Sequence, residues 1–180
     1  WTNDRQKCKF LIKRLLNLQK NHIFAEECEI THINEEDEKL FMEKNSFNKL
    51  IHSDIRIGLK YREKIVSIMS FSCKGNGKYE LLFCSDKSDT KVDGSGKRMI
   101  EYFIEKYCPS SIISYDDRRC SFNDFYNECG FVKNGFTGPK YFYVVKNKRM
   151  NEDELKKISN LPKVVNKIYD CGGIRYEWKR

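Results

Sequence analysis

A glycine-containing loop at residues 91–97 separates a strand pattern from a helical pattern, and this feature constrains the fold most strongly. The apolar run before it, residues 79–84, has the length and composition of a buried strand. After it, Ile100, Phe103 and Tyr107 recur at helical spacing. Such a loop presents backbone N–H groups at the start of a helix, where anions bind. The pattern therefore indicates either a phosphate-binding loop or an ordinary flexible connection.

The remaining patterns predict strands and helices that alternate around this loop. Strands are expected at residues 29–33, 55–60, 64–72, 112–115 and 141–145, and helices at residues 4–20, 35–44, 122–129 and 151–159. From residue 55 to residue 145 the order is β-β-β-α-β-α-β, which predicts a mixed sheet with helical crossovers. A final apolar run at residues 168–178 is expected to form a closing strand or hairpin.

The first 24 residues differ from the rest of the chain because their apolar residues stand among basic ones. They predict a basic amphipathic helical segment at residues 1–24, followed by a single domain at residues 25–180. Lys13 and Arg14 on this helix are candidates for contacts with nucleic acid. The formal net charge of +8 favours a polyanion or a phosphate-rich cofactor, although a Lys-rich solvated surface explains it equally well.

Composition argues against several other kinds of site. The eight cysteines include no C-x2-C pair and the three histidines stand alone, so we expect no metal. No segment approaches the roughly 18 to 20 apolar residues of a membrane span, so we expect no membrane partner. Reduced thiols in a chain of this size indicate a cytoplasmic location. The chain starts at Trp1, which fits a processed product or a piece of a longer polypeptide.

Two motifs in this sequence resemble those of the GNAT acyltransferases. The Arg/Gln-x-x-Gly-x-Gly/Ala loop of that family corresponds to Lys91-x-x-Gly94-x-Gly96, where lysine keeps the positive charge but lacks the planar donor fork or the amide. The helix end Phe-Tyr-x-x-x-Gly-Phe of the family corresponds to residues 125–131. The resemblance implies an α/β (α+β) fold with a mixed, mostly antiparallel central sheet flanked by helices. The pyrophosphate-type loop should connect the third strand of the hairpin region to the following helix.

The same resemblance implies a donor and roles for individual residues. The donor is acetyl-CoA or another acyl-CoA. The residues expected to hold it are Lys91, Val92, Asp93, Gly94, Ser95, Gly96 and Lys97, together with Phe83 and Cys84, whose backbone N–H groups face the thioester carbonyl. Tyr126 is placed to protonate the leaving thiolate, or it is a partly buried aromatic residue that anchors its helix.

Four segments are similar to a narrower group, the bacteriophage-encoded GNAT-like domains related to the Mom DNA-modification protein and associated with homing endonucleases. The segments are residues 57–59 with 66–71, the glycine loop, residues 113–119 with 126 and 130–131, and residues 168–172. The similarity to this group implies that Asp117 is the base that takes the acceptor's proton. The alternative is that Asp117 belongs to an ion-pair cluster that orders the loop. Arg118 and Arg119 beside it would grip a phosphate backbone.

These similarities predict an acyltransferase that uses acyl-CoA or a related donor and acts on or near nucleic acid, with Mom-like modification of DNA bases as the model. Its location would then be the cytoplasm of the host. The alternative is a catalytically silent GNAT-like module that binds DNA for a homing endonuclease or another phage protein.

Overall fold

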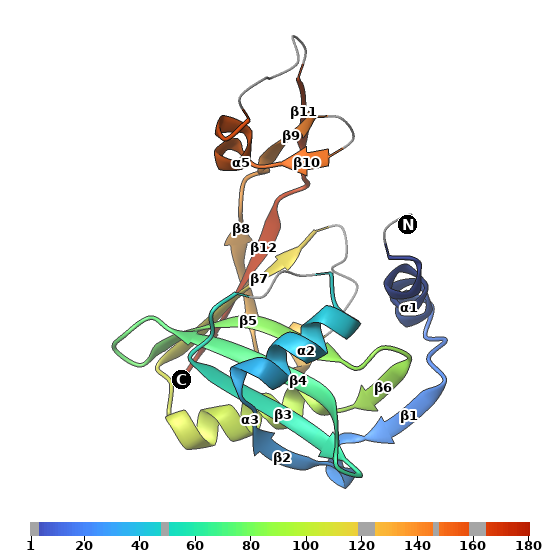
Figure 1. Ribbon diagram of the computed structural model, residues 1–180. Coiled ribbons are helices and arrows are strands. Elements are labelled where there is room, and N and C mark those ends of the chain that lie inside the picture. The colour runs from blue at the N-terminus through green and yellow to red at the C-terminus, as the bar shows by residue number, and fades with distance from the viewer. Residues whose placement is uncertain (1–3, 48–50, 119–124, 146–147, 159–164) are drawn as a thin grey trace.

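The computed structural model describes residues 4–47, 51–118, 125–145, 148–158 and 165–180. Its central sheet has seven strands, which are β2 Glu29–His32, β3 Ile55–Tyr61, β4 Lys64–Cys73, β5 Lys78–Asp86, β7 Ser111–Asp117, β8 Val132–Phe136 and β12 Gly173–Lys179. They lie in the order β2-β3-β4-β5-β7-β12-β8 (Figure 1). All neighbours run antiparallel except β5 and β7, which are parallel. The predicted mixed, mostly antiparallel α/β fold is confirmed.

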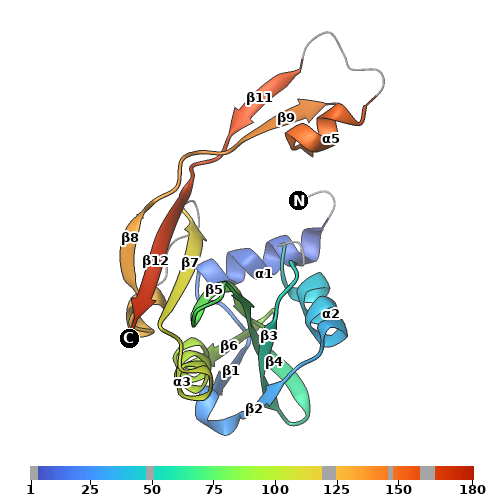
Figure 2. The ribbon, with the colours of Figure 1, turned by 90° about the vertical axis from the view of Figure 1, so that its left-hand side faces the viewer.

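Helices α2 (Glu35–Asn45) and α3 (Ser95–Tyr107) cover opposite faces of this sheet (Figure 2). Strand β4 explains the arrangement, because alternate side chains of a strand point to opposite faces. Phe71 stacks on Phe103 of α3 with ring centroids 3.7 Å apart, whereas Ile68 belongs to the cluster that contains Phe41 and Met42 of α2. The sheet is therefore buried on both sides around β3, β4 and β5.

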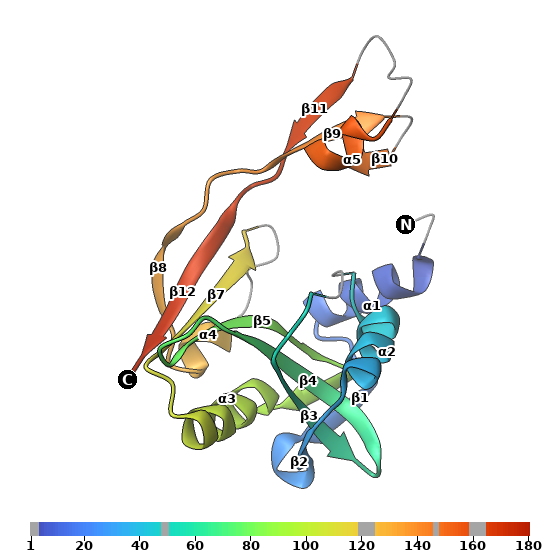
Figure 3. The ribbon, with the colours of Figure 1, turned by 60° about the vertical axis from the view of Figure 1, so that its left-hand side comes forward.

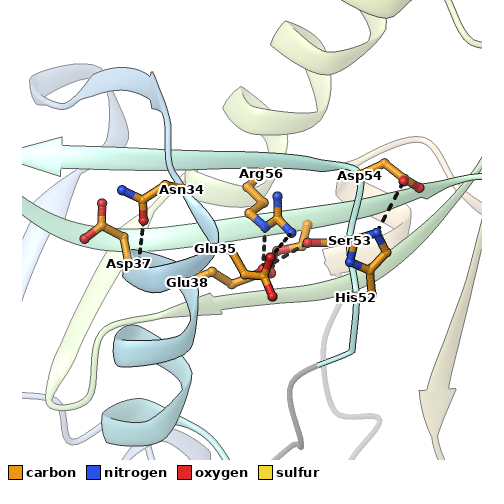
Figure 4. A network of polar contacts seen from close by, with 9 residues as sticks. Asn34, Glu35, Asp37, Glu38, His52, Ser53, Asp54 and Arg56 are labelled. Atoms are coloured by element: carbon orange, nitrogen blue, oxygen red, sulfur yellow. Dashed lines mark hydrogen bonds and ion pairs between the residues drawn. The ribbon is translucent and has the colours of Figure 1, made fainter.

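A buried carboxylate fixes α2 to the sheet (Figure 4). The side chain of Glu38 is almost fully buried and accepts hydrogen bonds from the Ser53 hydroxyl at 2.9 Å and from Nε of Arg56 at 2.7 Å. Ser70 of β4 also donates to it. Because every one of these donors lies on or next to β3 and β4, the network orients α2 across both strands.

The N-terminal helix is shorter than predicted. Helix α1 (Arg5–Leu15) ends before Asn17, whose φ of 52° is outside the helical range. Residues 21–24 then form β1 (Asn21–Phe24), which pairs in parallel with β6 (Thr90–Asp93), and a 3-10 helix follows at Ala25–Glu27. Sequence patterns predicted neither strand, because a four-residue strand has too little periodicity to recognise. No helix in the described ranges is long and apolar enough to cross a membrane.

A segment near the C-terminus forms a projecting arm, which we define as the described residues between 137 and 172. Strands β8 and β12 lead out of the sheet into this arm (Figures 1 and 3). It contains a second sheet in the order β10-β9-β11 and a short helix. These elements are β9 Tyr141–Val145, β10 Lys148–Met150, α5 Glu152–Lys156 and β11 Asn166–Tyr169. The predicted strand at 141–145 exists, but it belongs to the arm and not to the central sheet.

Strand β8 takes the edge position of the central sheet, and the sequence analysis did not predict it. All five of its residues are exposed, so it lacks the apolar alternation that identifies a strand. Helix α4 (Phe125–Glu128) lies within the predicted range 122–129, of which residues 122–124 are outside the described part of the chain.

Candidate functional site

Strands β5 and β7 start side by side and then separate. Their pairing ends at Leu81 of β5 and Ser114 of β7, whereas β5 continues to Asp86. Leu82 forms a β-bulge, because Phe71 and Ser70 of β4 pair with Leu81 and Phe83 and skip the residue between. The bulge and the loss of pairing leave the edge of β5 that faces β7 open from Leu82 onward.

A cavity of about 620 Å³ lies at this opening. Its walls are residues 81–86 of β5, residues 91–97 of the glycine loop, residues 114–116 of β7, and Phe125, Tyr126 and Glu128 of α4. Arg14, Asn17 and Gln19 of the N-terminal segment line it as well. All nine residues that the sequence predicted to hold a donor are therefore gathered in the lining of one cavity.

The glycine loop is anchored from below by Asp86. One carboxylate oxygen accepts the backbone N–H of Val92 at 3.0 Å, and the other accepts the hydroxyl of Ser95 at 2.9 Å. Burial raises the pKa of Asp86 above its usual range, and these hydrogen bonds act in the opposite direction. The contacts hold the loop against the end of β5, so that α3 begins at the cavity.

Two glycines have conformational or steric reasons to occupy the loop. Gly94 caps α3 with a φ of 78°, a left-handed conformation that favours glycine. At Gly96 a Cβ atom would lie only 2.6 Å from Cδ2 of Phe125. The loop motif and the Phe-Tyr motif of α4 are therefore packed directly on each other.

Lys91 has a partner within the loop. Its ammonium lies 2.7 Å from a carboxylate oxygen of Asp93, and the hydrogen bond from Lys91 lowers the pKa of Asp93. His22 of β1 lies 3.7 Å from the same carboxylate. The charge of Lys91 is thus already balanced within the protein.

Phe83 and Cys84, which the sequence suggested as backbone donors to a thioester, line the cavity from β5. The side chain of Phe83 belongs to the core cluster under α2. Cys84 is half-buried, and burial raises the pKa of its thiol well above the usual range. The thiol therefore stays protonated near neutral pH and is a poor nucleophile.

Tyr126 lies on the cavity wall formed by α4 and β7. Its hydroxyl is 3.0 Å from the hydroxyl of Ser114, and its ring stacks on Tyr176 with centroids 3.9 Å apart. Burial raises the pKa of the Tyr126 phenol, so the group remains protonated at neutral pH. The phenol is thus fixed and protonated. Because the Ser114 hydroxyl donates its proton to the carbonyl of Leu81 at 3.1 Å, the Tyr126 O–H donates to Ser114.

A second cavity, of about 550 Å³, adjoins the same opening near the base of the arm. The two cavities share Leu81, Leu82, Tyr115 and Asp116 in their linings. Asp117, the base predicted from the sequence, lines only this second cavity. Asp116 lines both, so the structure places this neighbouring carboxylate between the two spaces.

The basic residues predicted to bind nucleic acid lie in two separate places. Lys13 forms an ion pair with Asp89 at 3.0 Å, and Arg14 donates to the hydroxyl of Ser85 at 2.9 Å. Arg118 lies near the arm, where its backbone and side chain donate to the carbonyls of Gly172 and Cys171 at 3.3 Å. Arg119 is outside the described residues.

The roles of Asp86 and Ser114 in this site were not predicted from the sequence. Both contacts depend on the tertiary structure, and neither residue stands in a motif that assigns it a partner. Over the described ranges, no group of three or more His, Cys, Asp or Glu side chains is arranged to hold a metal ion.

Comparisons with known proteins agree with this geometry at the level of the fold. No protein-family model matches the chain, and no curated protein sequence matches it significantly. The ribosomal-protein-S18-alanine N-acetyltransferase from Escherichia coli gives a TM-score of 0.57 at 10% identity, over 84% of this chain and 93% of that one. An acetyltransferase from Bacillus subtilis in complex with CoA gives 0.53 at 12% identity, over 85% and 99%.

A GNAT family acetyltransferase from Elizabethkingia anophelis with acetyl-CoA bound gives a TM-score of 0.52 at 10% identity, over 86% of this chain and 99% of that one. Each alignment includes nearly the whole of the known enzyme. The chain therefore has the fold of the GNAT acetyltransferases, as its two motifs predicted.

Proposed function

We propose that this protein is an acyltransferase that takes its acyl group from acetyl-CoA or a related acyl-CoA. The observation that carries the proposal is the cavity between the separated strands β5 and β7, which continues to the glycine loop at the start of α3. A helix start with glycines in front of it suits phosphate, and the open edge of β5 suits an extended amide-containing chain. A CoA thioester combines these two chemistries.

The lining of the cavity fits such a donor. Residues 91–97 would hold the phosphates, and the backbone of residues 82–86 would hold the chain that carries the thioester. When bound, the thioester supplies an activated acyl group and a thiolate leaving group. The backbone N–H groups beside the Leu82 bulge are the candidates for polarising the thioester carbonyl.

Two side chains supply the proton chemistry in this proposal. Tyr126 turns its O–H from Ser114 to the departing sulfur and donates a hydrogen bond to it, a role that its raised pKa supports because the phenol keeps its proton. Asp116 accepts the proton of the acceptor amine, because it borders both cavities. Asp117, which the sequence favoured for this role, remains the alternative. The protonated thiol of Cys84 favours direct transfer without an acyl-cysteine intermediate.

For the acceptor, the similarity to Mom-like phage domains suggests a DNA base. The net charge of +8 supports contact with nucleic acid. The charge of the second cavity argues against DNA there, because four carboxylates line it (Glu80, Asp116, Asp117 and Asp170) and Lys140 is the one cation among its described lining residues. A catalytically silent DNA-binding module is the other candidate, and the open donor cavity argues against it.

A thermal-shift titration with acetyl-CoA tests the proposal. Binding to the folded state raises the free energy of unfolding by RT ln(1 + [L]/Kd), so the melting temperature rises with ligand concentration. An acyl-transfer assay follows with the Tyr126→Phe variant, for which we expect kcat to fall about 100-fold while Kd for acetyl-CoA changes little. Tyr169→Phe, at an exposed tyrosine of the arm, is the matched control. Absence of a shift at millimolar acetyl-CoA would contradict the proposal and favour the silent module.

A further inference from the structure

Helix α1 contributes a wall to the donor cavity although it lies far from the glycine loop in the sequence. Arg14 lines the cavity together with Asn17 and Gln19 from the turn that follows the helix. No residue of α1 is buried. Two of its side-chain contacts tie it to the wall of the cavity: Arg14 donates to Ser85 of β5, and Lys13 pairs with Asp89 in the β5–β6 connection.

The cations of the cavity differ in their partners. Three cationic side chains line it, namely those of Arg14, Lys91 and Lys97. Lys91 lies 2.7 Å from Asp93, and Lys97 lies 3.9 Å from Glu101. The recorded side-chain hydrogen bond of Arg14 goes instead to a neutral hydroxyl, from Nη1 to Ser85. A guanidinium carries five N–H donors, so Arg14 has donors to offer to a ligand.

A carboxylate close to the loop increases the need for such a cation. The carboxylate of Asp86 is half-buried against the loop, and Arg14 is one of the groups that lower its pKa against the effect of burial. A phosphate placed over this carboxylate needs a compensating positive charge. Arg14 is the lining cation that lies near Asp86 and that no carboxylate pairs in the described contacts.

Gln19 provides an independent observation that points to a ligand. Its Oε1 atom is buried and has no hydrogen-bond partner in the described structure. Exchanging the oxygen and nitrogen of the amide leaves a buried polar atom at the same place. Because an unsatisfied buried polar group is costly, this site favours a ligand that carries a complementary donor or acceptor.

We propose that Arg14, assisted by Gln19, forms a second phosphate-binding wall of the donor site, opposite the glycine loop. The proposal rests on the acyl-CoA function proposed above and assigns to α1 the cationic role that the ion-paired Lys91 does not fill. Arg14 then binds the phosphates of CoA with its guanidinium, and Gln19 pairs with a polar group of the same ligand. Arg14 is therefore a donor-site residue and not part of a nucleic-acid surface.

Isothermal titration of CoA and of phosphate-free pantetheine tests this assignment. We expect Arg14→Gln to raise Kd for CoA at least about tenfold, and to leave Kd for pantetheine within about twofold, because only the phosphate contact is lost. Lys9→Gln is the matched control, since it removes an exposed positive charge from the same helix outside the cavity lining. Arg14→Lys should restore binding only in part.

The outcomes separate this inference from the proposed function. If the wild type binds CoA and Arg14→Gln binds it equally well, the inference is wrong and the proposed function stands. If Lys9→Gln weakens CoA binding as much as Arg14→Gln, the effect comes from the general charge of α1, and the inference is again wrong. If the wild type binds no CoA, the proposed function itself fails. Thermal unfolding of each variant verifies that it is folded, and the pantetheine titration detects any loss that does not depend on phosphate.

Discussion

The two walls of the donor cavity differ in how they are held. On the glycine-loop side, Val92, Ser95 and Gly96 are buried, and Asp86 anchors the loop through two hydrogen bonds. On the other side, α1 has no buried residue, and Leu11, Ile12 and Leu15 are exposed. The contacts of α1 with Asp89 and Ser85 are only partly buried, and polar contacts near the surface contribute about 0 to 1 kcal/mol each.

The two walls therefore determine different properties of the cavity: the glycine loop its shape, and α1 its charge. The core of the domain positions the glycine loop, so this wall sets the form of the cavity and has little freedom to adapt. Helix α1 is held weakly and carries the cation, so its position depends on what occupies the cavity. In such a site, binding of the donor would order α1, while the glycine loop would stay unchanged.

Substitution of Gly96 should have the largest effect, because it disturbs the rigid wall. The Cβ of alanine at this position would overlap the ring of Phe125, so α4 must move. We expect Gly96→Ala to lower the free energy of unfolding by about 1 to 3 kcal/mol, as overpacked cores generally do. Urea denaturation measures the change.

Gly138→Ala provides the control for this substitution. A Cβ at Gly138 meets no described atom within 4 Å, so we expect a change of less than about 0.5 kcal/mol. Equal losses in the two variants would show that Gly96 has no special packing role. The claim that the core holds the glycine-loop wall rigidly would then be wrong.

A smaller effect is expected from the pH dependence of the anchor beneath the loop. Burial raises the folded-state pKa of Asp86 above its ordinary value of 3.8, so the folded state favours the protonated form. The stability gained in this way is complete below the ordinary pKa, and it is lost as pH rises through the folded-state pKa. The Asp86→Asn variant lacks this titration.

The melting temperature of the wild type minus that of Asp86→Asn should therefore fall as pH rises above about 4 and then become constant. Differential scanning calorimetry of both proteins over this range measures the difference, in which all other titrating groups cancel. Two parallel curves would mean that Asp86 is not a buried anchor of the loop.

Residues 79–107 illustrate what the sequence could predict. The run at 79–84 and the spacing of Ile100 and Phe103 reflect burial on one side of each element, and both elements were found. The glycine motif and the Phe-Tyr motif lie in the order typical of the family, and the structure adds that Gly96 and Phe125 are packed on each other. Periodicity and local motifs thus predicted the centre of the fold and the rigid wall.

The parts that could not be predicted depend on contacts between distant segments. Arg14 meets Ser85 across 71 residues, and no local pattern distinguishes it from the other basic residues of its helix. Strand β8 is exposed throughout, so nothing in its sequence marks it as a strand. Asp116 and Asp117 are adjacent in sequence, and only the opening between β5 and β7 distinguishes the residue that borders both cavities from its neighbour.

Amide hydrogen exchange with and without saturating acetyl-CoA tests the central claim most directly, because it locates the ligand on both walls at once. We predict slower exchange in residues 82–86 and 92–97, which form the open strand edge and the glycine loop. We also predict slower exchange in α1, where the free protein is least constrained. Unchanged exchange in residues 82–97 at saturation would contradict the account, because the ligand would then bind elsewhere or not at all.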